Sequence, residues 1–385
     1  MPTLRAPLAY RLVRSLIRPF LRWYCGLEHP AAGTVPADGP LVVVADHRSY
    51  LDAFLLAAAF PRPLSFLTTV EAFRRGPDRF LLERLGCIRL RRHSPDPTAL
   101  RQVLQTLERG GAVGIFPEGE RSWDGGPSTL LPGVARLLVL AGAPIVAVRI
   151  EGSYRLWPRW GRGPHRTRVV FHWTEPQPAG EDEQALEHWL VDALATHPGP
   201  PSRRRRSASD VGRLIWRCPT CGHFDAVRGR RDGTVFCLRC GAAGVLHDGT
   251  HLDWEGSGPR PLRVWARAVA LSGAERRALA PPGPRPHRHW PFLRLSDGGS
   301  DLPLVPRGIG EAVLTPEALV LRARRWRAYV PAESIRSVAV EGSHKLQVAT
   351  ARRTYELRYR RGSPRGPRAH LEAWLEARGI PFRRG

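Results

Sequence analysis

Short apolar runs alternate with amphipathic segments between residues 41 and 195. Runs typical of buried strands occupy residues 41–44, 64–68, 87–90, 112–116, 144–150 and 168–173. Segments with apolar residues at helical spacing occupy residues 51–60, 80–85, 97–109, 134–140 and 182–195. A strand in a parallel sheet is a continuous apolar run, because helices cover both of its faces. The pattern therefore predicts an α/β domain with a largely parallel sheet at residues 29–196.

The N-terminal region, residues 1–28, predicts an amphipathic helix at a membrane surface. Its arginines are three or four residues apart and form one stripe beside a wide apolar face: Arg11, Arg14, Arg18 and Arg22. Such a stripe, with Trp23 and Tyr24 near its end, is typical of a helix that lies in the membrane plane. A helix packed on the domain, with its arginines in water, is the alternative. Charges and helix breakers interrupt every window of ~18 residues, so we expect neither a transmembrane span nor a secretory signal.

Beyond residue 196 the composition changes several times. Residues 197–210 are rich in Pro, Ser and Arg and predict a basic linker. A cysteine module follows at residues 211–250, and a Pro- and Gly-rich linker is expected at residues 251–302. Residues 303–385 contain short strand-like runs and end on a helical segment. That order resembles a pleckstrin-homology (PH) or GRAM domain, and any other small β-barrel is the alternative.

Four of the six cysteines have the spacing of a zinc site. They form two Cys-x-x-Cys pairs separated by 15 residues: Cys218, Cys221, Cys237 and Cys240. Two such turns supply four thiolates to a tetrahedral Zn²⁺, and four protein ligands leave no position for water, so we expect a structural zinc ribbon. A redox-active dithiol pair is the alternative. Cys25 and Cys87 suggest no disulfide framework, which favours a reducing cytoplasm.

The chain is strongly basic, with 59 Lys and Arg residues against 35 Asp and Glu and a net charge of +24. An excess of this size is typical of proteins with an anionic partner, such as a membrane surface, a nucleic acid or a phosphorylated substrate. Lys345 is the only lysine, however, and such an arginine bias is also expected from a GC-rich genome. The net charge alone therefore does not identify a partner, because the positions of the basic residues in the fold are not known from the sequence.

The first candidate site follows the strand predicted at residues 41–44, where the sequence reads Asp-His-Arg-Ser-Tyr-Leu-Asp. Acyl transfer to an alcohol needs a base, because a neutral hydroxyl is a weak nucleophile, and His47 is of the right type. A carboxylate such as Asp52 can fix the ring tautomer and stabilise the imidazolium. The nucleophile is then the hydroxyl of the substrate itself. A loop histidine without a special role is the alternative.

Two further motifs carry candidate binding residues. Phe-Pro-Glu-Gly-Glu-Arg-Ser at residues 116–122 follows a predicted strand, so Glu118, Gly119 and Arg121 lie at the edge where open parallel sheets bind ligands. Glycine permits close backbone approach, and a guanidinium group matches the geometry of a phosphate. Gly-Cys-Ile-Arg-Leu-Arg-Arg ends on Arg92. Each motif alone is equally typical of a structural loop with a surface arginine.

Together and in this order, the motifs resemble the glycerolipid acyltransferase family that includes lysophosphatidate acyltransferase. The family's H-x-x-x-x-D, G-x-I-x-x-x-R and F-P-E-G-x-R-S blocks match residues 47–52, 86–92 and 116–122, and its proline block is similar to residues 143–148. The resemblance implies that His47 is the base and Asp52 its orienter. It also implies that Arg92, Glu118, Gly119 and Arg121 bind the glycerol phosphate, and that Pro144 shapes the acyl-donor side.

The resemblance implies an O-acyltransferase that moves a fatty acyl group from acyl-CoA or acyl carrier protein to lysophosphatidate, as a peripheral or monotopic protein at the cytoplasmic face of an anionic membrane. Another lysolipid or glycerol 3-phosphate as acceptor, and a non-catalytic membrane tether, are the alternatives. Nucleic-acid binding is not favoured, because no aromatic platform for stacked bases stands out. The chain departs from the family pattern at Asp46, where the family usually has asparagine, and at Ala147, where it usually has a second proline.

Overall fold

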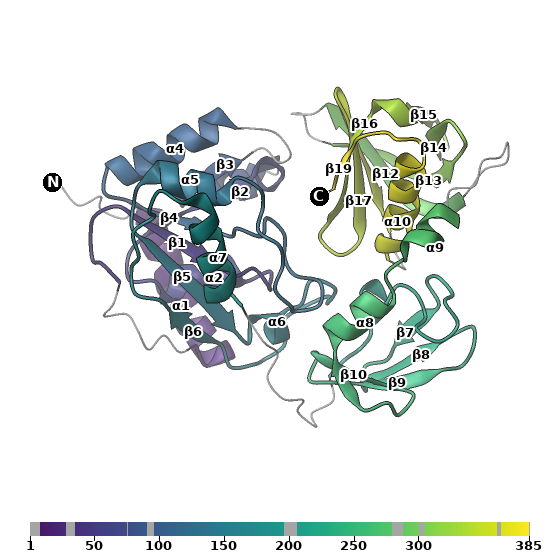
Figure 1. Cartoon of the computed structure of the whole chain (residues 1–385), viewed down its shortest axis with the longest axis horizontal. Coiled ribbons are helices and arrows are strands. Elements are labelled where there is room, and N and C mark those ends of the chain that lie inside the picture. Colours follow the sequence, from purple (N-terminus) through teal and green to yellow (C-terminus); the bar gives the residue numbers. More distant parts are fainter. Residues whose placement is uncertain are drawn as a thin grey trace. The chain divides into compact units, whose positions relative to one another are not determined.

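The computed structural model describes residues 8–27, 35–74, 76–90, 96–195, 206–278, 288–299, 304–359 and 363–384. The chain divides into two compact units (Figure 1). The first comprises Met1–Arg159 and Gly163–Gly199, and the second comprises Trp160–Arg162 and Pro200–Gly385. The main division therefore falls within the segment 197–210, for which the composition predicted a linker.

A six-stranded sheet forms the centre of the first unit. Its strands are β1 (Leu41–Ala45), β2 (Leu64–Thr69), β3 (Ile88–Leu90), β4 (Ala112–Ile115), β5 (Ile145–Glu151) and β6 (Val170–Trp173). They lie in the order β3-β2-β4-β1-β5-β6, and all neighbouring pairs are parallel except β5 with β6. The expected α/β domain with a largely parallel sheet is confirmed.

The helices of the first unit are α1 (Leu8–Cys25), α2 (Asp52–Ala59), α3 (Gly76–Arg84), α4 (Pro97–Glu108), α5 (Val134–Ala141), α6 (Ser153–Leu156) and α7 (Glu183–Ala193) (Figure 1). Successive β1 side chains point to opposite faces and so serve two cores. Val43 packs in the core that contains residues of α1 and α2. Val44 packs in the core that contains residues of α4, α5 and α7. Burial on both faces explains the apolar run of β1, and places its carboxyl end in the middle of the sheet edge.

Helix α1 carries an apolar stripe that the fold leaves exposed. Its Leu21 and Cys25 are buried in the core, next to α2. On another side, spaced by three or four residues, five apolar side chains are 54% to 74% exposed: Leu8, Leu12, Leu16, Phe20 and Trp23. The apolar face expected from the sequence is therefore divided between the core and the surface. Among the described helices, α1 included, none has the length and apolar character needed to cross a membrane.

Two largely antiparallel sheets form the centre of the second unit. A five-stranded sheet runs in sequential order and consists of β7 (Val227–Gly229), β8 (Thr234–Cys237), β9 (Ala243–His247), β10 (His251–Trp254) and β11 (Pro259–Pro261). Two short helices follow, α8 (Leu262–Ala268) and α9 (Gly273–Ala278). This sheet extends beyond residue 250, where the cysteine module was expected to end.

The C-terminal part of the second unit is an eight-stranded sheet in the order β15-β14-β13-β12-β18-β17-β16-β19. Its strands are β12 (Arg288–Gly299), β13 (Val305–Leu314), β14 (Ala318–Ala323), β15 (Trp326–Pro331), β16 (Ile335–Glu341), β17 (Lys345–Thr350), β18 (Arg353–Arg358) and β19 (Arg383–Arg384). Helix α10 (Arg365–Glu376) packs on β16 and β17. The expected β-rich C-terminal domain is present, and its kinship with PH or GRAM domains stays a prediction.

Regular structure also occupies the segment 251–302, where the composition predicted a linker. This segment contains the long strand β12 as well as β10, β11, α8 and α9. The pairing of β12 with β13 has register shifts between Trp290 and Leu293 and between Leu295 and Ser296. Proline is tolerated in a strand at such irregularities, and Pro291 lies in the first of them. Composition alone therefore misjudged this segment.

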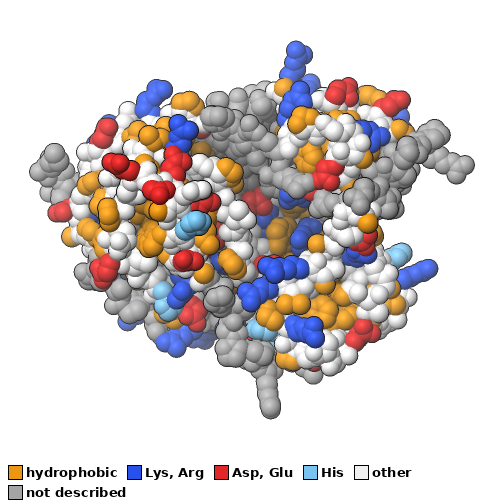
Figure 2. Space-filling model, in the orientation of Figure 1, with side chains coloured by type: hydrophobic (Ala, Val, Ile, Leu, Met, Phe, Trp, Pro, Cys, Tyr) orange, Lys and Arg blue, Asp and Glu red, His pale blue; other side chains and the backbone are white. Residues whose placement is uncertain are grey.

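The surface charge is distributed over the face shown in Figure 2. Arginine side chains lie there among acidic and apolar side chains, on both units. A net charge of +24 therefore does not by itself locate a binding surface.

Candidate active site and metal centre

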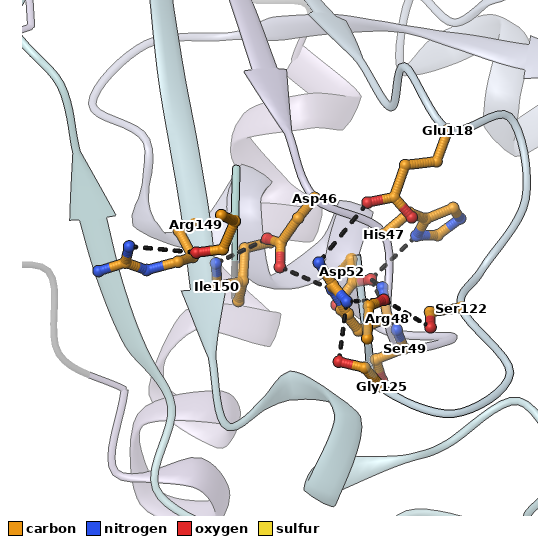
Figure 3. A network of polar contacts seen from close by, with 12 residues as sticks. Asp46, His47, Arg48, Ser49, Asp52, Glu118, Ser122, Gly125, Arg149 and Ile150 are labelled. Atoms are coloured by element: carbon orange, nitrogen blue, oxygen red, sulfur yellow. Dashed lines mark hydrogen bonds and ion pairs between the residues drawn. The ribbon is translucent and has the colours of Figure 1, made fainter. Parts of the chain in front are cut away.

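The turn after β1 holds His47 and Asp52 together (Figure 3). One carboxylate oxygen, Oδ2 of Asp52, accepts hydrogen bonds from Nδ1 of His47 at 2.9 Å, from the Arg48 amide at 2.6 Å and from the Ser49 amide at 2.7 Å. Asp52 begins α2 and is fully buried. Because a carboxylate can only accept, Nδ1 of His47 carries the proton and Nε2 keeps its lone pair. Nε2 is thus the atom that can act as a base.

The His47 ring is largely shielded from water. It stacks on Phe116 with 4.3 Å between the ring centroids, and its side chain is 17% exposed. Burial lowers the pKa of His47, the hydrogen bond and charge of Asp52 oppose that shift, and the charges of Arg121 and Arg159 add to it. A lowered pKa keeps the imidazole neutral at neutral pH, which a general base requires.

The second motif begins where β4 ends, and its loop is tied to the His47 turn. The amide of Ser122 donates a hydrogen bond to the carbonyl of His47 at 2.9 Å. Gly119 has a φ of +68°, and a Cβ atom there would lie 2.3 Å from Cδ1 of Leu131. The loop therefore needs glycine at this position. The fold brings the two motifs together at the carboxyl edge of the parallel strands, where open α/β sheets bind ligands.

Two arginines place positive charge near His47. The guanidinium of Arg121 lies 3.8 Å from the centroid of the Tyr50 ring. Arg159 donates to Glu120 at 2.6 Å and to the carbonyl of Arg121 at 3.0 Å, and so braces the backbone of the motif. Arg159 lies outside every sequence motif, and nothing in the local sequence signals its place. A base flanked by two cations is suited to an anionic substrate.

Glu118 points into the protein rather than toward solvent. Its side chain is 2% exposed, and its Oε1 lies 3.7 Å from Nη2 of Arg48. Burial raises the pKa of Glu118 to about 8, while Arg48 acts against this shift and Asp46 adds to it. The carboxyl group thus faces a buried guanidinium, whereas the family resemblance implied contact with a substrate phosphate.

Two other predicted binding residues, Pro144 and Arg92, are not among the described residues around His47. Pro144 immediately precedes β5, and its carbonyl accepts a hydrogen bond from the Val42 amide at 2.9 Å. Val42 is near the start of β1, whereas His47 follows the end of that strand, so Pro144 lies at the opposite edge of the sheet. This position does not support a role for Pro144 beside the reacting atoms. Arg92 lies outside the described residues.

Four cysteines of the second unit converge as the spacing predicted: Cys218, Cys221, Cys237 and Cys240. Their sulfur atoms all lie within 4.8 Å of one another. The Sγ atoms of Cys218 and Cys240 are 3.8 Å apart, as are those of Cys221 and Cys237. A tetrahedral Zn²⁺ with Zn–S bonds of about 2.3 Å separates its sulfur ligands by about 3.8 Å. The cluster therefore has the dimensions of a four-thiolate metal site.

The two cysteine turns have matching backbone geometry. Gly222 and Gly241, each directly after the second cysteine of a pair, have φ values of +69° and +79°. Their amides donate to the carbonyls of Cys218 at 3.0 Å and Cys237 at 3.1 Å. The amide of Arg239 also approaches Sγ of Cys237 at 3.3 Å. Left-handed glycines close both turns, so that the paired thiols point toward one centre.

Comparison with known proteins shows what the core of the first unit resembles. Residues 30–151 match the family model described as Acyltransferase. The chain is similar to 1-acyl-sn-glycerol-3-phosphate acyltransferases from Brassica napus chloroplasts (26% identity; 35% of this chain, 41% of the relative), Bacillus subtilis (23%; 37% and 71%) and Pseudomonas aeruginosa (28%; 46% and 77%).

The matched region is only part of these proteins. The chain spans about two fifths of the length of the chloroplast relatives, 41% for the Brassica napus protein and 39% for that of Arabidopsis thaliana. It is also similar to the crystal structure of PlsC, the 1-acyl-sn-glycerophosphate acyltransferase of Thermotoga maritima. That likeness has a TM-score of 0.44 and 22% identity, and covers 48% of this chain and 76% of that one.

Proposed function

We propose that this protein transfers a fatty acyl group from a thioester donor to the free hydroxyl of lysophosphatidate. The observation that carries the proposal is the shielded His47–Asp52 pair, with 2.9 Å between Nδ1 and Oδ2, beside the charges of Arg121 and Arg159. The names of the relatives, 1-acyl-sn-glycerol-3-phosphate acyltransferases, support the same acceptor. Acyl-CoA and acyl carrier protein both present the acyl group as a thioester, so the proposal admits either donor.

The proposed reaction uses His47 twice. Its Nε2 takes the proton of the acceptor hydroxyl while the hydroxyl oxygen attacks the thioester carbonyl carbon. The carbon–sulfur bond of the tetrahedral intermediate then breaks, and the departing sulfur takes the proton back from His47. Asp52 accepts the Nδ1–H hydrogen bond and stabilises the imidazolium between the two proton transfers. The base is neutral again at the end of each turnover.

The acceptor phosphate is assigned to the positive side of the site. Arg121 offers a planar pair of donors that suits a phosphate, and Gly119 is proposed to shape the loop that carries it. Arg92 remains a proposed second phosphate ligand from its motif. Arg159, which braces the Arg121 carbonyl at 3.0 Å, is proposed to hold Arg121 in place.

We propose that α1 seats the enzyme on the anionic cytoplasmic face of a membrane, as a peripheral or monotopic protein. Its exposed stripe includes Leu12 at 57%, Leu16 at 74% and Phe20 at 54%. Arg11 and Arg22 of the same helix are also exposed. An apolar stripe flanked by arginines lowers its free energy by entering the interface between acyl chains and anionic headgroups. Both the acceptor and the product of the proposed reaction are lipids of that interface.

We propose that the cysteine cluster binds one structural Zn²⁺. The support is the sulfur geometry, since four thiolates at tetrahedral separations complete the coordination of the metal. Bound zinc would contribute folding free energy to the second unit and take no part in the transfer.

The test of the proposed function is acyl transfer by the purified protein and by His47→Ala. Wild-type protein should convert lysophosphatidate to phosphatidate with acyl-CoA or acyl carrier protein, followed by mass spectrometry. Removal of the base should lower kcat by roughly 100- to 10,000-fold, with folding intact. Because burial lowers the pKa of His47 from 6.5, the wild-type rate should fall only when the pH drops below 6.5, where the imidazole becomes protonated.

The same assay separates the alternatives. Turnover of another lysolipid or of glycerol 3-phosphate in place of lysophosphatidate would change the assigned acceptor but keep the acyltransferase function. Near-normal turnover by His47→Ala would contradict the mechanism. Membrane binding without turnover of any acceptor would leave the protein as a non-catalytic tether.

A further inference from the structure

The guanidinium group of Arg48, the residue that follows the proposed base, is buried. Arg48 is 1% exposed, and it follows His47 in the sequence. Its Nε donates to Oδ2 of Asp46 at 3.0 Å, and its Nη1 donates to the carbonyl of Gly125 at 2.8 Å and to that of Gly126. Its Nη2 lies 3.7 Å from Oε1 of Glu118. All three nitrogen atoms are thus directed at oxygen atoms inside the protein.

These contacts join three segments that are remote in the sequence (Figure 3). Asp46 follows β1, and its second oxygen, Oδ1, accepts a hydrogen bond from the Ile150 amide of β5 at 2.7 Å. Glu118 and Gly125 belong to the loop after β4. Through the Asp46 carboxylate, Arg48 therefore connects the central strands and that loop at the carboxyl edge of the sheet.

Because the Arg48 guanidinium is buried, its hydrogen-bond acceptors must stand at fixed positions around it. A buried guanidinium without counter-charges is strongly unfavourable, so Arg48 must be met by fixed acceptors. Its planar group has donors in set directions, and a lysine ammonium could not reproduce them. The position of the Gly125 carbonyl, and with it the loop that carries Arg121, is therefore coupled to the turn that carries His47.

We propose that Asp46, Arg48 and Glu118 are positioning residues, which hold the His47 turn and the loop from residue 116 to residue 126 in the arrangement that the reaction requires. The proposal rests on the acyltransferase function proposed above. It assigns Glu118 to the support of the site and not to the acceptor, in contrast to the role implied by the resemblance. It also gives Asp46 a reason to stand where the family usually has asparagine, since a carboxylate compensates the buried charge of Arg48.

The burial of Glu118 supports this assignment. With a side chain only 2% exposed and directed at Arg48, the carboxyl group would have to leave its pocket to meet a substrate in solvent. In the structure, Oε1 of Glu118 instead lies 3.7 Å from Nη2 of Arg48.

The experiment compares steady-state kinetics of wild-type protein with three variants: Glu118→Gln, Asp46→Asn and Arg48→Lys. A positioning role predicts that kcat falls by about 10- to 100-fold, since small misplacements of reacting groups carry costs of this size. The KM for lysophosphatidate should stay within about twofold of the wild-type value. Glu118→Gln is nearly isosteric, so it can report even if Arg48→Lys fails to fold.

Arg62→Lys is the matched control. Arg62 is half-buried and, like Arg48, donates to carbonyl groups. Its acceptors are the carbonyls of Pro36, Gly39 and Gly110, near the amino ends of β1 and β4. Its replacement should lower the melting temperature and leave kcat unchanged. If Arg48→Lys and Arg62→Lys lose stability alike and both keep kcat, Arg48 is merely structural and the positioning role is wrong.

The kinetic pattern separates the remaining outcomes. A rise in the KM for lysophosphatidate in Glu118→Gln, with kcat preserved, would return Glu118 to the acceptor and overturn the proposal. Unchanged kcat and KM in both Glu118→Gln and Asp46→Asn would also overturn it. Inactive wild-type protein would instead contradict the proposed acyltransferase function, so the two failures are distinguishable.

Discussion

A single oxygen atom, Oδ2 of Asp52, fixes the orientation of the proposed base. It accepts from the His47 ring and from two backbone amides of the same turn, all within 2.9 Å. The spacing of five residues allows this, because His47 ends the extended segment after β1 while Asp52 starts the next helix. A neutral amide at this position has no negative charge, so it would not stabilise the imidazolium as the carboxylate does.

Arg121 should serve the acceptor more than the donor. In Arg121→Gln we expect the KM for lysophosphatidate to rise by roughly 10- to 100-fold, the equivalent of a lost charge-assisted hydrogen bond of about 1.5–3 kcal/mol. The KM for the acyl donor should change little. Kinetics in which each substrate is varied separately test this. Arg101→Gln, which removes an exposed arginine of α4, is the control and should leave both constants unchanged. Equal damage to both KM values in Arg121→Gln would contradict the assignment.

Local spacing in the sequence was enough to select the candidate residues that stand in short motifs. It did not select residues whose partners are remote in the sequence. His47, Asp52, Gly119 and Arg121 stand in short motifs next to predicted strands. Arg48 stands in one of these motifs as well, but its contacts with Gly125 and Glu118 exist only after the loop has folded back. Arg159 belongs to no motif. Pro144 belongs to one, but it directly precedes β5 at the opposite edge of the sheet from His47.

At the level of elements, apolar periodicity predicted the first unit well because its strands are buried on both faces and its helices on one. Such burial produces a clear pattern of apolar residues in the sequence. The pattern is weaker in strand β12, because register shifts interrupt the alternation of its side chains. For α1 the periodicity predicted a helix with an apolar face, but not which apolar residues the core would leave exposed.

Helix α1 should control binding to anionic vesicles. The double variant Leu16→Glu, Phe20→Glu places two charges in a stripe that is 74% and 54% exposed at these positions. We expect membrane partitioning to fall by at least about tenfold, because burial of each apolar side chain contributes about 1.5–3 kcal/mol and the carboxylates add repulsion from anionic lipid. Sedimentation with vesicles that contain phosphatidylglycerol measures the loss.

The matched control for α1 is Leu140→Glu. Leu140 of α5 is 58% exposed and lies on a helix without an apolar stripe of this kind. It should bind vesicles as wild-type protein does. Unchanged vesicle binding by the α1 double variant would show that the helix only packs on its domain, which is the alternative that the sequence left open.

For the molecule as a whole, the division into two units separates the proposed chemistry from the proposed metal. His47, Asp52 and Arg121 belong to the first unit, which has a sheet and cores of its own. The cysteine cluster belongs to the second. Sequence composition predicted a linker where the two units divide, but it did not predict that the short segment Trp160–Arg162 belongs to the second unit. That assignment depends on contacts with residues far along the chain. Arg213 donates to the Trp160 carbonyl at 3.3 Å, and Arg162 pairs with Asp210 at 2.9 Å.

Loss of the metal should therefore destabilise the second unit without abolishing transfer. We expect one zinc per wild-type chain and none in the double variant Cys218→Ser, Cys237→Ser, as measured by elemental analysis. Metal binding is coupled to folding in such modules, so limited proteolysis of this variant should cleave the second unit first. Cys87→Ser, which changes a cysteine outside the cluster, should keep its zinc. Acyl transfer to detergent-solubilised lysophosphatidate should persist in the metal-free variant, because detergent removes any need for membrane recruitment. If the first unit resists proteolysis but transfer is lost, the expectation that transfer does not depend on the second unit is wrong.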